Sequence, residues 1–189
     1  MQPRALVASD PLERTAVSVD QRARLEAMFE AHHNVVWRML RRTGLDPQNA
    51  ADVGQQAFVV AIERIADIWP GSERAFLVGT ALRLARRSRR NAARLVLDPE
   101  LALPGGEARP AEAQLIALQL LDRVLNHLDP ALVEVFVLFD VEGFSAPEIS
   151  VALRLPVGTV ASRLRRARQQ FRQAAARIEC VWKREEGER

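Results

Sequence analysis

The sequence predicts an all-α protein of two small helical modules joined by a Pro/Gly-rich linker, with a helix-turn-helix in the C-terminal module. Apolar residues recur at three- and four-residue spacing through most of the 189 residues. Between 96 and 113 this spacing stops, and three prolines, two adjacent glycines and several acids take its place. We therefore expect a disordered lead-in at 1–20, a first module at 21–95, the linker at 96–113, a second module at 114–175 and a tail at 176–189.

The first module is expected to begin with two helices separated by a short turn. Asp20 is a candidate cap for the first helix, and Gly44 is expected to end that helix in a left-handed conformation. Asp46 and Pro47 then supply a capping residue followed by a proline at the first helical position, which predicts the start of the second helix.

The second helix carries large apolar residues on its expected core side and polar residues elsewhere. The core side is predicted to include Ala51, Phe58, Ile62 and Ile65. The polar positions are Asp52, Gln55, Gln56 and Glu63. Spacing alone gives these polar residues no role beyond ordinary exposure to solvent.

An aromatic loop and a basic helix follow. Trp69 lies beside Pro70 and Gly71, and Ser72 is expected to cap the next helix. The far end of that helix is strongly basic, with Arg83, Arg86, Arg87, Arg89, Arg90 and Arg94. The helix dipole favours some positive charge there, but this number of arginines exceeds what capping needs and favours a nucleic-acid backbone as the counter-charge. An exposed aromatic ring beside such a helix suits stacking on single-stranded bases, while a plain core role for Trp69 is about equally compatible with the sequence.

The second module is expected to hold about four helices, the last two forming the helix-turn-helix. Asp129 and Pro130 predict a helix start, and Gly143 a helix end. Ser145 and Glu148 form a capping box, and the segment 154–156 predicts a turn because Pro156 disfavours helical geometry in the residue before it. The helix after the turn carries hydroxyl and guanidinium groups that suit phosphate oxygens and guanine edges better than a merely solvated basic face: Thr159, Ser162, Arg163, Arg165, Arg166 and Arg168.

Composition excludes several other classes of protein. Cys180 is the single cysteine, which rules out an internal disulfide and a cysteine-based zinc cluster and favours a passive thiol over a redox switch. His32 and His33 are adjacent and His127 has no suitably spaced partner, so we expect no metal site, no catalytic site and no cofactor. No apolar run approaches membrane-spanning length and the N-terminus lacks the apolar core of a signal peptide, so we expect a cytoplasmic protein without membrane insertion.

Residues 128–172 resemble a known family. The spacing E-G-F-S-x-x-E-I, the start V-G-T-V and the run S-R-L-R-R-A-R are similar to the minus-thirty-five-binding module of bacterial sigma factors of the sigma-70 family, specifically the two-module extracytoplasmic-function (ECF) group. Upstream, residues 50–65 resemble the D-L-V-Q-E-x-F helix of the same group, with Asp52, Gln55, Gln56 and Phe58 on matching positions.

The resemblance implies a sigma factor that directs RNA polymerase core enzyme to promoter DNA and initiates transcription, without catalysis of its own. It implies that Asp52, Gln55 and Gln56 contact the clamp helices of the polymerase, and that residues 157–168 enter the minus-thirty-five major groove. It also implies that the minus-ten element is opened and held by Trp69, Arg83, Arg86, Arg87 and Arg90. Family members are usually held inactive by an anti-sigma factor, which is therefore an implied partner.

The chain departs from the family pattern at several positions. Thr80 stands near a common Trp, and Arg87 and Arg89 stand near a common Asn or Asp. Ala161 replaces a frequent Lys and Pro156 a frequent capping Ser. The alternative is a stand-alone helix-turn-helix regulator of LuxR-like type, which would not carry the second resemblance.

Overall fold

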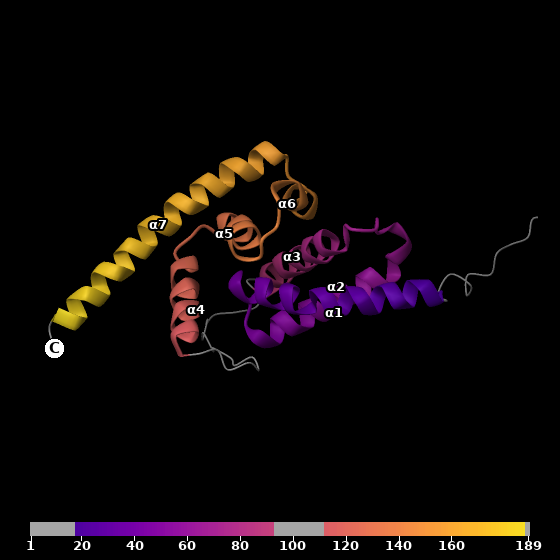
Figure 1. Ribbon diagram of the computed structural model, residues 1–189, viewed down its shortest axis with the longest axis horizontal. Helices are drawn as coiled ribbons and strands as arrows, with labels where there is room; N and C mark the ends of the chain where they lie inside the picture. Colours follow the sequence, from indigo (N-terminus) through magenta and orange to yellow (C-terminus); the bar gives the residue numbers. More distant parts are fainter. Residues whose placement is uncertain (1–17, 93–111, 188–189) are drawn as a thin grey trace, which may run out of the picture.

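The computed structural model describes residues 18–92 and 112–187, and within these ranges it consists of helices and turns with no β-strand (Figure 1). The all-helical prediction is therefore confirmed for the described part of the chain. Most of the predicted lead-in and linker, together with Arg94, lies outside the described residues.

Three helices and a short 3-10 turn form the first module: α1 (Val19–Arg42), α2 (Pro47–Glu63), η2 (Ile65–Asp67) and α3 (Glu73–Ala92). The cap of α1 differs from the prediction, because Ser18 and not Asp20 occupies the capping position and forms a capping box with Gln21. Gly44 has a φ of 93° after the end of α1, and Asp46 caps α2 with Pro47 in its first turn, as predicted.

The core face of α2 was only partly predicted. Ile65 is buried, but Ile62 is 46% exposed and Ala51 is exposed. The buried residues of α2 are instead mostly small: Ala50, Val53, Gly54, Ala57 and Ala61. Small side chains allow α1 and α3 to pack closely against α2, so the largest apolar residues do not mark the inner face of this helix.

The second module comprises α4 (Glu112–Leu125), α5 (Pro130–Phe136), the π-helical segment η3 (Val137–Val141), α6 (Ala146–Leu153) and α7 (Val157–Gly187). The expected helix-turn-helix is present as α6 and α7. The α7 backbone continues without interruption through most of the segment that was predicted to be a tail.

The two modules pack against each other through α3 and α6 (Figure 1). Gly79 of α3 lies so close to α6 that a Cβ atom at this position would collide with the Ala152 carbonyl oxygen and lie 3.0 Å from the Ala152 Cα. The absence of a side chain at Gly79 therefore sets how closely the modules approach.

Arginines of the first module pair with groups of the second around this contact. Glu142 accepts from Arg38 at 2.9 Å and from Arg42 at 2.6 Å. Glu134, which is 4% exposed, forms an ion pair with Arg86. The Arg74 guanidinium lies 3.7 Å from the centre of the Phe144 ring. These pairings favour one particular alignment of the two modules against each other.

Candidate nucleic-acid interface

The turn between α6 and α7 is closed by hydrogen bonds of Ser150 and Leu155. The Leu155 amide donates to the Ser150 carbonyl at 3.1 Å, and the Ser150 hydroxyl donates to the Leu155 carbonyl at 2.5 Å. Arg154 ends α6 at φ 55° and ψ 48°, a left-handed conformation that costs a non-glycine residue roughly 1–2 kcal/mol. The Pro156 carbonyl then accepts from the Thr159 amide at 2.8 Å, which starts α7 directly after the turn.

The start of α7 separates an apolar inner face from a basic outer face. Val160, Leu164 and Ala167 are buried against the module core. Arg165 and Arg166 lie on the exposed side of the helix. The structure therefore brings part of the predicted DNA-reading set to one solvent-facing surface, as a recognition helix requires.

The other predicted residues of α7 lie at the edges of this surface. Thr159, Ser162 and Arg163 are half-buried, and the Ser162 hydroxyl donates to the Thr159 carbonyl at 3.0 Å. Arg168 donates to both oxygens of Asp140, at 3.0 and 2.6 Å, and the hydrogen bond to Asp140 raises the Arg168 pKa. In this conformation Arg168 is thus tied to η3, while Arg165 and Arg166 are exposed and form no ion pair with any residue that the structure describes.

The capping box at the start of α6 is present as predicted. The Glu148 carboxylate accepts from the Ser145 amide at 2.8 Å and from the Ser145 hydroxyl at 2.7 Å. Hydrogen bonds from the Ser145 side chain, followed by those from its backbone, lower the Glu148 pKa from its usual 4.5.

Ser145→Ala should therefore destabilise the chain by about 1 kcal/mol, the usual cost of losing an N-cap. Because the Glu148 pKa is lowered in the folded state, the contribution of its carboxylate is present above pH 4.5 and is lost as the pH falls through the lowered value. Urea unfolding at pH 7 and at about pH 3 measures both effects. Ser88→Ala in α3 is the control, and an equal loss of stability in both variants would contradict the capping role.

The loop before α3 presents an aromatic side chain to solvent. Trp69 is 80% exposed, so the core role left open above is wrong. The Ser72 amide and hydroxyl both donate to the Trp69 carbonyl, at 3.0 and 2.7 Å. From α1, Arg24 donates to the Ile68 carbonyl at 2.6 Å and to Glu73 at 2.6 Å, and thereby holds both ends of the loop.

The predicted basic residues in the second half of α3 lie in four different surroundings. Arg87 and Arg90 are exposed. Arg86 is held in the ion pair with Glu134, and this hydrogen bond raises the Arg86 pKa. Arg89 donates to the Thr43 carbonyl at 2.8 Å, which makes it a structural residue. Arg83 lies half-buried in a cleft between the two modules.

The polar residues of α2 lie together on an open surface. Asp52, Gln55 and Gln56 are exposed on one side of the helix. Val59 and Ile62 continue this side with exposed fractions of 48% and 46%. A polar patch that continues into exposed apolar side chains is typical of a protein-binding surface.

Sequence reasoning gave no site role to four residues that shape these surfaces: Arg24, Arg64, Glu134 and Arg154. Arg24 and Glu134 act on groups that are distant in the sequence, Arg24 on the Trp69 loop and Glu134 on Arg86. The left-handed conformation of Arg154 has no signal in its own residue type, because glycine is the residue usually found there.

Neither a metal centre nor a membrane span is found in the described ranges. Among residues 18–92 and 112–187, no group of three or more His, Cys, Asp or Glu side chains is arranged to hold a metal ion. No helix within the same ranges is both long and apolar enough to cross a bilayer.

Comparisons with known proteins match both modules. Residues 28–95 match the family model of sigma-70 region 2, and residues 118–171 match that of sigma-70 region 4. A stand-alone regulator of LuxR-like type does not account for the first of these matches, so that alternative has no support.

Two curated relatives and two solved structures agree with these matches. The ferric citrate uptake sigma factor FecI of Escherichia coli is 32% identical over 144 residues, which cover 71% of this chain and 81% of FecI. The ECF RNA polymerase sigma factor SigE of Mycolicibacterium smegmatis is 29% identical over 80% of this chain, and the chain spans 62% of the length of SigE.

Among solved structures, CnrH in complex with the cytosolic domain of CnrY has a TM-score of 0.62 at 26% identity, over 89% of this chain and 94% of CnrH. The sigma factor RpoE in complex with the anti-sigma factor NepR, from Bartonella quintana, shares the fold with a TM-score of 0.66 at 20% identity, over 83% of this chain and 97% of RpoE. The chain belongs to the ECF group of RNA polymerase sigma factors within the sigma-70 family.

Proposed function

We propose that this chain directs bacterial RNA polymerase to specific promoters and starts transcription there. The observation that carries the proposal is the presence, in one chain, of a region 2 match over α1–α3 and a region 4 match over the helix-turn-helix. The chain acts as a specificity subunit and not as an enzyme, and it works in the cytoplasm, where the chromosome and the polymerase are.

The division of labour follows from the surfaces described above. The exposed side of α2 with Asp52, Gln55 and Gln56 binds the core enzyme. The exposed ring of Trp69 stacks on a base of the opened minus-ten strand, while arginines of α3 hold its phosphates. The outer face of α7 reads the minus-thirty-five element in the major groove.

An anti-sigma factor is the expected regulatory partner. RpoE of Bartonella quintana was solved with such a protein, and CnrH with the cytosolic domain of CnrY. The similarity of this chain to both structures extends over more than four fifths of its length, so it offers a comparable pair of modules to a partner of this kind.

Run-off transcription with purified core enzyme tests the proposal. Adding the full chain should produce a transcript from a promoter upstream of its own gene, and no transcript should form with core enzyme alone. A chain that binds this DNA but neither co-purifies with core enzyme nor yields a transcript would be a stand-alone regulator, and the proposal would fail.

The triple variant Asp52→Ala, Gln55→Ala, Gln56→Ala should bind core enzyme about tenfold more weakly or worse, because a few side chains carry most of the binding energy of an interface and a combined loss of about 1.4 kcal/mol corresponds to tenfold. All three side chains are exposed, so folding should be preserved. Gln173→Ala, also exposed and distant in α7, is the matched control. Equal core binding by the triple variant and the control would move the polymerase contact away from α2.

A further inference from the structure

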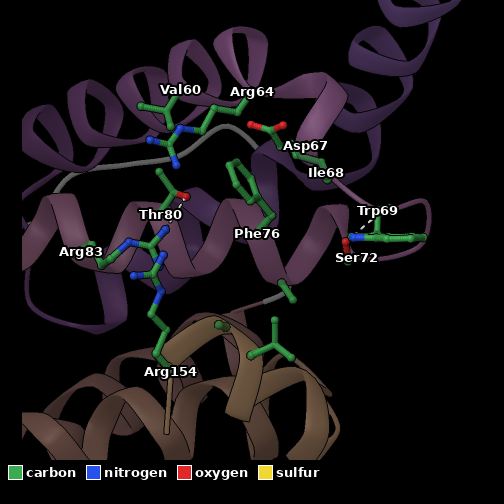
Figure 2. A pocket seen from close by; sticks show the side chains of 13 residues that line it. Val60, Arg64, Asp67, Ile68, Trp69, Ser72, Phe76, Thr80, Arg83 and Arg154 are labelled. Carbon is green, nitrogen blue, oxygen red and sulfur yellow. Dashed lines mark hydrogen bonds between the residues drawn. The ribbon is translucent and has the colours of Figure 1, made fainter.

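A cleft of about 210 Å³ lies between the two modules and is lined by guanidinium groups from three helices (Figure 2). Arg64 is the C-terminal cap of α2, Arg83 lies within α3, and Arg154 ends α6. Of the described residues that line the cleft, Asp67 is the only acid. Three guanidinium groups and one carboxylate leave the cleft with an excess of positive charge.

Arg64, Arg83 and Arg154 differ from three arginines that form ion pairs across the module interface. Arg38, Arg42 and Arg86 each pair with a carboxylate of the opposite module. Arg83 instead donates to the Thr80 hydroxyl of its own helix at 2.8 Å. Among the side chains that the structure describes, no carboxylate oxygen lies within 4.0 Å of a guanidinium nitrogen of Arg64, Arg83 or Arg154.

The positive charges in the cleft act on one another. Burial, followed by the charges of Arg154, Arg64 and Arg86, lowers the Arg83 pKa. Figure 2 shows the Arg154 side chain extending from the left-handed end of α6 toward Arg83. The dipole of α6 favours a cation at its C-terminus, but it does not require two guanidinium groups to face each other. An anion between them would relieve this repulsion.

We propose that the cleft binds a small phosphorylated anion, a di- or triphosphate group held between Arg64, Arg83 and Arg154. The planar guanidinium fork matches phosphate oxygens in a bidentate manner. The cleft is smaller than the roughly 300–1,000 Å³ of pockets for drug-sized ligands, so it accommodates the phosphate groups and leaves any attached nucleoside outside.

Such a ligand would couple the two modules. It would contact α2 and α3 of the first module and α6 of the second, so its binding energy is available only while the modules are packed together. The ligand therefore stabilises this arrangement in proportion to its concentration. Binding of this ligand depends on Arg154 of the helix-turn-helix module. This dependence distinguishes the ligand from a DNA strand that is held by the arginines of α3.

Isothermal titration calorimetry on the full chain tests this site with pyrophosphate, tripolyphosphate, a nucleoside triphosphate and a single-stranded oligonucleotide. The wild-type chain should bind pyrophosphate or tripolyphosphate saturably. Arg154→Gly should reduce this affinity at least tenfold, whereas Arg123→Ala, an exposed arginine of α4 outside the cleft, should leave it within twofold. Because glycine suits the left-handed conformation, the melting temperature of Arg154→Gly should not fall, which separates loss of the site from loss of the fold.

The titrations with the nucleoside triphosphate and the oligonucleotide identify the source of the phosphate. Tighter binding of the nucleoside triphosphate than of tripolyphosphate would identify a nucleotide as the ligand, and equal binding would identify the inorganic anion; both results support the site. The proposal is overturned if only the oligonucleotide binds, if Arg154→Gly keeps wild-type affinity, or if Arg123→Ala weakens binding equally. These titrations need no polymerase, so their outcome is independent of the transcription test.

Discussion

Gly79→Ala should separate the two modules although alanine is the better helix former. In a helix interior, glycine to alanine normally stabilises by roughly 0.5–1 kcal/mol. At Gly79 the new Cβ would collide with the backbone of Ala152, which cannot rotate away as a side chain could. The helices α3 and α6 must therefore move apart, and the interface around Glu134 and Glu142 opens with them. We expect a larger radius of gyration by small-angle X-ray scattering and a lower midpoint of urea unfolding.

Gly54→Ala in α2 is the matched control for this substitution. Gly54 is also buried, but a Cβ there would lie 3.9 Å from Val36 and 4.0 Å from Leu40, which is ordinary van der Waals contact. This variant should be as stable as the wild type or more so, with an unchanged radius of gyration. If both glycine variants behave alike, the close approach of α6 to Gly79 does not limit the packing of the modules.

Opening the modules would change the surroundings of several basic side chains. Arg86 was expected to face DNA, yet it is paired with Glu134 across the interface. Glu134 is only 4% exposed, so separating the modules both hydrates this carboxylate and frees the guanidinium. The packed arrangement thus leaves α3 with fewer free arginines than its sequence suggests.

Local signals in the sequence correctly predicted where α2 and α6 begin. Asp46 with Pro47, and Ser145 with Glu148, act on backbone groups within three residues, so the pattern alone determines the result. The turn at Pro156 was predictable for the same reason. The cap of α1 was missed because Ser18 and Asp20 are both good capping residues, and spacing does not decide between them.

Contacts between distant residues could not be predicted in this way. The inner face of α2 was assigned from its large apolar residues, whereas close helix packing selected small ones such as Ala57 and Ala61. Likewise, the sequence shows that Arg83 and Arg86 are basic, but only the fold shows that one enters a cleft and the other an ion pair. The role of an arginine depends on which group the tertiary structure places opposite it.

The double variant Arg165→Ala, Arg166→Ala should lower promoter affinity by roughly 100-fold. Each good contact of an arginine to a base edge contributes about 1–3 kcal/mol, so a loss of about tenfold per arginine is a conservative expectation. Both side chains are exposed on α7, so the substitutions should not disturb the core. Fluorescence anisotropy with a promoter fragment and assembled holoenzyme, at several salt concentrations, measures the effect.

The salt dependence separates the two ways in which these arginines can act. Each lost phosphate contact lowers the slope of log affinity against log salt by about one unit and weakens all sequences equally. A lost base contact leaves the slope nearly unchanged and relaxes the preference for one base pair. Arg177→Ala, an exposed arginine further along α7, should change neither quantity. If the double variant instead keeps wild-type affinity, the outer face of α7 does not contact the promoter. Both side chains are exposed, so their removal has no compensating effect on the fold that could hide a 100-fold loss of affinity.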